Sequence, residues 1–451
     1  MNAKTGLVGL LLAIVITFSG GCGSSQTAGT IPPPTNTQHF EYVFTSGFIY
    51  VYDIDHSGAL VKTLTVPTTA GVRGAVASAV TKKLYIAFGS DSGSGGSQLA
   101  YDLATDTVVW TQNYLHGVDS QAISPDGTKI FMPTGEVSPG STWEVEDPAT
   151  GNDIASISVG GTGTGSGTGP HNTIVNQTGT RVYMGLRDPN LGGGQGINDF
   201  GVADTTTKQI VGKITPTQSG VRPFTINSKE TLVYMSVTDF LGFQVGDLTT
   251  GKVIYTVPID GTGIPGFTTS FSVTDPSHGI ALSADDSTLY LVDYPNNYVH
   301  VFDVSKVPAS APKQIDNIKL PDNFTANQAQ CAYDCGGDGW LHLSHDGAYL
   351  FVGDTPDVIS TSTRKLAMNM PMMANSRIEI EIDFQGTTPV WAMGQRSSIG
   401  LSTSTAGLIP FLNRKTATNW FASVVSLLGV GLPVPGQGNG QHEKHLRSTF
   451  R

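Results

Sequence analysis

Short apolar runs that suit β-strands recur seven times along the chain, about 40 to 60 residues apart. Each contains at least one aromatic residue, and they are residues 42–44, 84–86, 130–132, 182–184, 233–235, 289–291 and 350–352. Polar turns precede most of them, as at 124–127, 176–179, 283–286 and 344–347. A second apolar run follows most of them and ends in Asp before a Thr/Gly turn, as at Asp102 and Asp247. The repeating unit is therefore strand, turn, strand.

No stretch of useful length shows the 3.6-residue apolar period of a helix. A strand repeat of this length is typical of propeller blades. We therefore predict an all-β fold, a seven-bladed β-propeller with antiparallel blades around a central channel, over residues 40–385. The chain begins this region at an outer strand near Tyr42, so the first blade lacks an inner strand. Residues 377–382 alternate strictly between charged and Ile positions and can supply it, which would close the ring.

Composition agrees with one turn-rich domain. The chain has 451 residues, of which 55 are Gly and only 14% are charged. Length alone would suggest two or three domains, but seven small sheets around one axis use about this many residues. The formal net charge of −11 argues against a nucleic-acid partner, which needs a concentrated basic surface.

The first residues have the pattern of an export signal. Lys4 precedes an apolar run over 6–18, and small residues at 19–21 lead to Cys22. We expect residues 1–21 to be a signal peptide and 22–39 a flexible tether. The Cys after small residues is similar to a bacterial lipobox, although Ser19 stands where Leu is usual. The resemblance implies lipidation of Cys22 and a membrane partner in the cell envelope, on the outer membrane or its periplasmic face. Ordinary secretion and a retained anchor helix are the alternatives.

Cys331 and Cys335 form an even pair in an exported chain, where disulfides persist. A local disulfide between them is our interpretation. A metal pair and haem attachment are the alternatives, but no further zinc ligands stand out nearby and the Cys-x-x-Cys-His motif is absent. The repeat stops at about residue 386, and we expect residues 386–451 to form an irregular or disordered tail.

Three segments resemble the YVTN-type β-propeller repeat of exported bacterial and archaeal proteins. They are residues 42–45 (Tyr-Val-Phe-Thr), 123–127 (Ile-Ser-Pro-Asp-Gly) and 202–207 (Val-Ala-Asp-Thr-Thr-Thr). The resemblance covers about residues 40–385 and implies the propeller fold. It does not select a function, because such folds host sensors, scaffolds, lactonases and quinone-dependent dehydrogenases.

Inner strands of a propeller line its channel, and their first residues point toward one mouth. We read these positions five residues before the Ser or Asn that opens each turn. They are Arg73, Asp119, His171, Arg222, His278 and Gly339, with Trp340 beside the last. Polar residues that converge there could bind an anionic or carbonyl ligand, with Arg222 exposed at the mouth. The other interpretation is that any propeller mouth is wet and polar.

Other polar residues have structural interpretations. His116 lies near the rim or on a loop, and His342 is a buried structural histidine. Six Asp residues precede turns, where they can accept backbone N–H bonds and need not bind metal. They are Asp53, Asp102, Asp147, Asp204, Asp247 and Asp303.

Three functions fit this pattern. The first is a non-catalytic, monomeric binding module for an unknown small molecule or protein, with no cofactor and no metal. The second is a lactonase-like hydrolase, in which the Arg/His rim polarises a carbonyl and a His acts as base. The third is a relative of quinone-linked dehydrogenases. The first is preferred because the chain contains none of the usual catalytic motifs.

Overall fold

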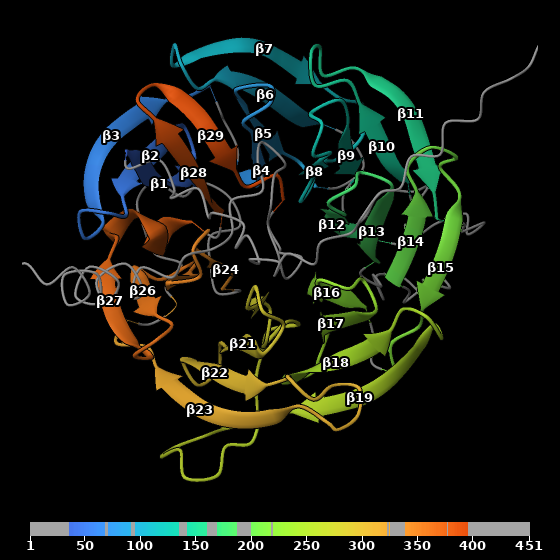
Figure 1. Cartoon of the computed structure of the whole chain (residues 1–451), viewed down its shortest axis with the longest axis vertical. Coiled ribbons are helices and arrows are strands. Elements are labelled where there is room, and N and C mark those ends of the chain that lie inside the picture. The colour runs from blue at the N-terminus through green and yellow to red at the C-terminus, as the bar shows by residue number, and fades with distance from the viewer. Residues whose placement is uncertain are drawn as a thin grey trace, which may run out of the picture.

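The structure is a computed structural model that describes residues 36–67, 71–91, 95–134, 142–159, 169–186, 200–217, 220–322, 324, 339–376 and 378–395. These residues form seven small antiparallel sheets in a ring, as Figure 1 shows. The predicted all-β, seven-bladed propeller is therefore confirmed. Within the described ranges, no helix is long and apolar enough to cross a membrane.

We number the blades along the chain. Blade 1 contains β1 (Thr37–Thr45), β2 (Phe48–Asp53), β3 (Ala59–Thr65), β28 (Glu379–Gln385) and β29 (Thr388–Ala392). Blade 2 contains β4 (Val72–Ser78), β5 (Lys83–Gly89), β6 (Gly96–Asp102) and β7 (Thr107–Asn113). Blade 3 contains β8 (Ala122–Ile123), β9 (Ile130–Pro133), β10 (Thr142–Glu146) and β11 (Asp153–Ser158). Blade 4 contains β12 (Pro170–Val175), β13 (Arg181–Leu186), β14 (Phe200–Asp204) and β15 (Ile210–Ile214).

The remaining blades repeat this order. Blade 5 contains β16 (Val221–Ile226), β17 (Leu232–Val237), β18 (Gly242–Asp247) and β19 (Lys252–Pro258). Blade 6 contains β20 (Ile280–Leu282), β21 (Thr288–Asp293), β22 (Tyr298–Asp303) and β23 (Lys313–Lys319). Blade 7 contains β24 (Leu341–Leu343), β25 (Tyr349–Val352), β26 (Asp357–Ser360) and β27 (Lys365–Asn369). A 3-10 helix, η1 (Pro371–Asn375), then leads back to blade 1.

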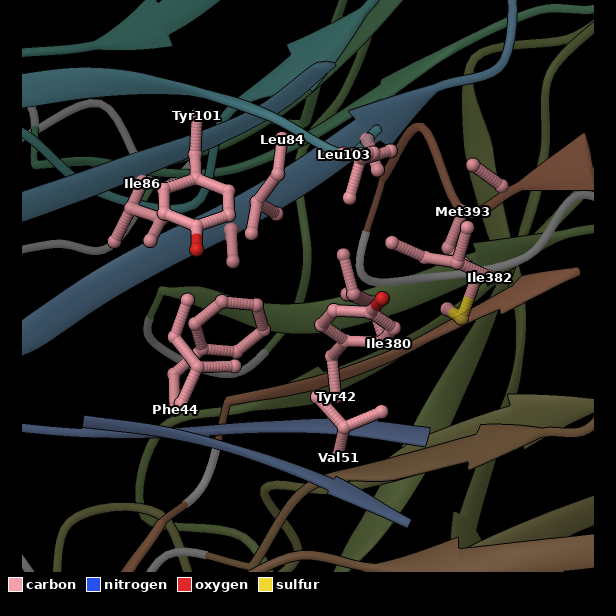
Figure 2. Close-up of a cluster of buried hydrophobic side chains, with 14 of the residues drawn as sticks. Tyr42, Phe44, Val51, Leu84, Ile86, Tyr101, Leu103, Ile380, Ile382 and Met393 are labelled. Atoms are coloured by element: carbon pink, nitrogen blue, oxygen red, sulfur yellow. The ribbon is translucent and has the colours of Figure 1, made fainter. Parts of the chain in front are cut away.

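Six of the seven apolar runs lie in the second strand of blades 2 to 7, and the first lies in β1, which pairs with β28 and β2 in the five-stranded blade 1. Both faces of these strands pack against neighbouring blades, so consecutive residues are all buried: Leu84, Tyr85 and Ile86 are each 0% exposed. The outer strands, by contrast, are mostly exposed, as in β3 and β7. Hydrophobic clusters therefore form between blades, and Figure 2 shows the one between blades 1 and 2.

The ring closes through β28, which pairs with β1 in antiparallel register, Glu41 opposite Glu381. This confirms the predicted closing strand. The alternate residues Ile380 and Ile382 pack into the cluster of Figure 2 beside Tyr42. Strands extend past both expected ends of the propeller, because β1 begins at Thr37 and β29 ends at Ala392.

The chain after β29 crosses from blade to blade. The carbonyl of Met393 accepts the Ala77 N–H at 2.8 Å, and that of Gly394 accepts the Ile123 N–H at 2.8 Å. The side-chain oxygen of Gln395 accepts the Val175 N–H at 2.7 Å. These three donors lie near the C-terminal ends of the inner strands of blades 2, 3 and 4. The segment Met393–Gln395 therefore ties three further blades to the closure.

The recurrent Asp residues fix turns, as expected. Each carboxylate accepts a backbone N–H from the turn that follows it, at 2.7 to 3.2 Å, and the six are Asp53, Asp102, Asp147, Asp204, Asp247 and Asp303. The predicted structural role of these residues is confirmed.

Candidate functional site

All six predicted rim residues lie at the start of an inner strand or just before it, one in each of blades 2 to 7. We call this set the rim cluster: Arg73, Asp119, His171, Arg222, His278 and Trp340. Every member is at most 5% exposed. The expectation that Arg222 is exposed at the mouth was wrong, because its guanidinium is enclosed by a loop from the next blade.

Three aromatic rings of the cluster meet across blades. The rings of His171 and His278 lie edge to face with centroids 5.9 Å apart. The ring of His278 also lies edge to face with that of Trp340, at 5.0 Å. His278 Nδ1 is 3.1 Å from the carbonyl oxygen of Gly339, which fixes the ring when Nδ1 carries the proton. Blades 4, 6 and 7 thus contribute to one contact group.

Arg222 is held in place by Thr238, which follows β17, and by the loop between β19 and β20. Its Nε donates to Thr238 Oγ1 and its Nη2 to Thr274 Oγ1, both at 2.9 Å. Its Nη1 lies 3.6 Å from Asp275 Oδ2, and the same oxygen is 3.9 Å from His278 Nε2. Asp275 therefore lies between Arg222 and His278, two residues that the sequence had suggested for a ligand site. Sequence reasoning missed it because it precedes the aligned position, although its spacing of three residues from His278 was visible.

Arg73 also has a carboxylate partner, since its Nη2 donates to Asp91 of the loop after β5. Asp91 too was missed, because a loop residue carries no strand register. Both arginines are therefore paired to aspartates, and a ligand anion would compete with these carboxylates. The inner segments of blades 2 and 3 also approach closely: a Cβ on Gly74 would lie 2.8 Å from the carbonyl oxygen of Asp119.

Hydrogen-bonding atoms remain unused beside these pairs. Asp119 Oδ1 accepts the Ser120 N–H at 2.8 Å, but its Oδ2 is buried with no hydrogen-bond partner in the described residues. The same holds for both amide atoms of Asn172, a residue that the sequence did not single out. A parallel backbone bridge pairs Ser120 with Asn172. The Asp119 carboxylate and the Asn172 amide therefore belong to adjacent inner segments. Buried polar atoms of this kind usually have a partner.

A surface pocket lies on the loop between β19 and β20 and on the turn after β21. It has a volume of about 400 Å³ and is lined by residues 270–273, Tyr294 and Pro295. Residues 270–273 immediately precede Thr274 and Asp275, the loop partners of Arg222.

Other candidate residues lie elsewhere or outside the described ranges. His116 lies on the loop before β8, stacked on Tyr114 and 3.3 Å from Asp153 Oδ2. His342 is buried and bonds Glu41, in agreement with its expected structural role. Cys22, Cys331 and Cys335 fall outside the described residues. In the part of the chain that the structure describes, no group of three or more His, Cys, Asp or Glu side chains is placed to hold a metal ion.

No protein-family model matches this chain, and no curated protein matches it. The fold assignment therefore depends on the seven sheets themselves. The resemblance to the YVTN-type repeat stays a prediction.

Proposed function

We propose that this protein is a binding module whose rim cluster takes a small neutral ligand rich in hydroxyl groups. The observation that carries the proposal is the unused hydrogen-bonding capacity of Asp119 and Asn172 on adjacent inner segments. Asp119 Oδ2 can only accept, whereas the Asn172 amide both donates and accepts. A hydroxyl group satisfies both, because it is itself a donor and an acceptor.

Charge supports a neutral ligand over an anion. Arg73 and Arg222 lie beside Asp91 and Asp275, so a ligand carboxylate would have to displace a carboxylate of the protein. The rings of His171, His278 and Trp340 contact one another in the same rim cluster and add apolar surface to it. Alternating polar groups and ring faces suit a sugar or cyclic polyol.

The test uses a panel of neutral monosaccharides and cyclic polyols, with acetate and inorganic phosphate as anionic probes. A neutral member should raise the melting temperature and change the emission of Trp340, and Trp340→Phe should remove that emission change. Asn172→Leu should abolish binding while it preserves folding, because it removes a buried amide that has no partner among the described residues. Binding of the anions alone, or equal binding by Asn172→Leu, would contradict the proposal.

Lactone hydrolysis is the second candidate, and one contact favours it. The Gly339 carbonyl orients His278 through Nδ1, which leaves Nε2 as the basic nitrogen beside Asp275. A panel of γ-lactones distinguishes the two functions. Turnover that disappears in His278→Gln would replace the binding proposal with a hydrolase.

The binding module is further proposed to be tethered to the cell envelope through lipid on Cys22. The proposal follows from the signal-like first residues and the Cys after small residues.

A further inference from the structure

The seam between blades 7 and 1 contains buried carboxylates, whereas the opposite face of the same strands is apolar. In the β1/β28 ladder, Glu41 lies opposite Glu381 and His39 opposite Asp383. Alternation sends the neighbouring residues of these strands, such as Ile380 and Ile382, into the cluster with blade 2 (Figure 2). The acidic side chains therefore lie on the other face, toward blade 7.

Two histidines of blade 7 contact these carboxylates. His342 Nε2 lies 2.9 Å from Glu41 Oε1. The His345 backbone N–H donates to Glu381 Oε2 at 2.7 Å, and its Nδ1 lies 2.6 Å from Asp383 Oδ2. His342 and Glu41 are 301 positions apart in the sequence. The last blade is thus bonded to the first through acid and histidine side chains.

The network continues to β29 and to the Met393–Gln395 segment that follows it and contacts blades 2, 3 and 4. The ring of His345 stacks on that of Trp391 in β29, with centroids 3.8 Å apart and planes at 6°. Met393 follows in the same segment, and its N–H donates to the Glu381 carbonyl at 3.1 Å. A change at His345 or Glu381 therefore reaches the residues that tie blades 2, 3 and 4 to the closure.

Burial dominates the acid–base behaviour of these carboxyl groups. It raises the pKa of Glu41 and of Glu381 well above the usual range, and the nearby Asp383 raises that of Glu381 further. Burial also raises the pKa of Asp383 to about 7, with smaller contributions from Asp346 and Asp55.

The pKa values of His39 and His345, two histidines of the seam, shift in opposite directions. Burial lowers the pKa of His39, but the bond to Asp55 and the charges of Asp383 and Glu381 outweigh it and raise the value to about 9. Burial lowers the pKa of His345, and the charge of His39 lowers it further. The charges of Glu381 and Asp346 raise it, but by less than burial lowers it. Glu379, also buried, is the remaining carboxylate on this face of β28.

These shifts have a definite sign for stability. A group whose folded pKa is raised binds its proton more tightly when folded, so its contribution is complete below the unfolded pKa and is lost as pH rises through the folded value. Asp383 loses its contribution through about pH 7, and His39 through about pH 9. His345 opposes them, since its contribution grows as pH rises through its lowered value.

We propose that this acid–histidine seam is a pH-sensitive latch on the ring, closed in mild acid and loosened in alkaline solution. The latch joins β28 to blade 7. Through Trp391 and Met393 it also holds the Met393–Gln395 segment, which contacts blades 2, 3 and 4. It is independent of any ligand at the rim cluster, whose residues lie at the starts of the inner strands of blades 2 to 7.

Hydrogen exchange of the whole protein tests the latch. After correction for intrinsic exchange, the protection of the β28 amides should fall about tenfold or more between pH 6 and pH 9, since one pKa unit corresponds to a factor of ten. Amides of β17, on another part of the ring, should change much less. Asp383→Asn should keep more of the β28 protection at pH 9 than wild type, because it removes the carboxyl group that would otherwise lose its proton through about pH 7.

Two variants complete the experiment. Glu144→Gln, a partly buried carboxylate on β10, is the matched control and should leave the β28 profile unchanged. Glu381→Gln repeats the test at the neighbouring carboxylate if Asp383→Asn does not fold. A flat wild-type profile for β28, or the same fall in protection in the folded Asp383→Asn variant as in wild type, would overturn the latch.

Discussion

Each arginine of the rim cluster is buried beside an aspartate from a loop, and this pairing decides what the residue can do. Asp275 is 7% exposed and Arg222 only 2%. A carboxylate at that depth needs a partner, because the loss of solvation is large. Arg222 is thus first a stability determinant, and any contact with a ligand comes in addition to that role.

Arg222→Ala is expected to lower the free energy of unfolding by about 3 to 5 kcal/mol, since it leaves Asp275 buried without its guanidinium. Chemical denaturation measures the loss. Lys62→Ala is the control, because the Lys62–Asp106 pair is well exposed and should contribute about 1 kcal/mol or less. Similar losses in the two variants would contradict the buried pairing.

Gly74 is also expected to matter for stability, because the backbone of blade 3 lies directly against it. A methyl group there would lie 2.8 Å from the Asp119 carbonyl oxygen and would separate the inner segments of blades 2 and 3. We expect Gly74→Ala to destabilise the protein by about 1 to 3 kcal/mol, as overpacking does. Gly212→Ala is the comparison in thermal melts, because its Cβ would have ordinary contacts at 3.6 Å and little should change.

Strands in this protein are stabilised by the blades on either side more than by their own propensity. The second strand of each blade is apolar at consecutive positions because both of its faces are covered, as Tyr85 and Ile86 of β5 illustrate. β28 differs, because one face is apolar and the other carries Glu379, Glu381 and Asp383. Its alternation was visible in the sequence, but it predicts burial on one side only, and the structure buries both.

Deletion of residues 376–384 should lower the melting temperature sharply, on the order of 10 °C or more, because it removes the strand between β1 and β29. Deletion of residues 400–451 removes none of the described strands and should leave the melting temperature close to that of wild type. Circular dichroism melts of the two variants make the comparison. Equal melting of the first variant and wild type would rule out closure through β28.

The whole molecule is a ring whose ends are joined by noncovalent contacts in the described residues. Strand pairing of β1 with β28, the acid–histidine seam and the Met393–Gln395 segment act together there. The proposed lipid on Cys22 would attach this ring to a membrane through the first residues of the mature chain. The two features are separate, so they can be tested separately.

Cys22→Ser is expected to move the protein from the membrane fraction to the soluble fraction, because a diacyl anchor supplies strong membrane partitioning. Fractionation followed by immunoblotting measures the distribution. Cys331→Ser is the control and should leave it unchanged. If the Cys22→Ser variant stays with the membranes, the anchor lies elsewhere in the chain.

The sequence by itself determined the number of blades, the strand that fills the second position of each, the turn aspartates and the closing strand. These features follow from local patterns, in which apolar runs, Asp and Gly recur at a fixed distance along the chain. It also placed the rim residues in one register, since that register repeats in every blade. Their partners could not be predicted in this way.

Only the tertiary structure decided that Arg73 and Arg222 are buried beside Asp91 and Asp275, and that Glu41 meets His342. The partners of the two arginines lie on loops outside the repeat, and the last contact joins the two ends of the propeller. The strand β29 was missed because its single partner, β28, is itself the end of the repeat. The arginine pairs depend on loop conformations that no repeat encodes, and the contact of Glu41 with His342 depends on how the ring closes, which is a property of the whole fold.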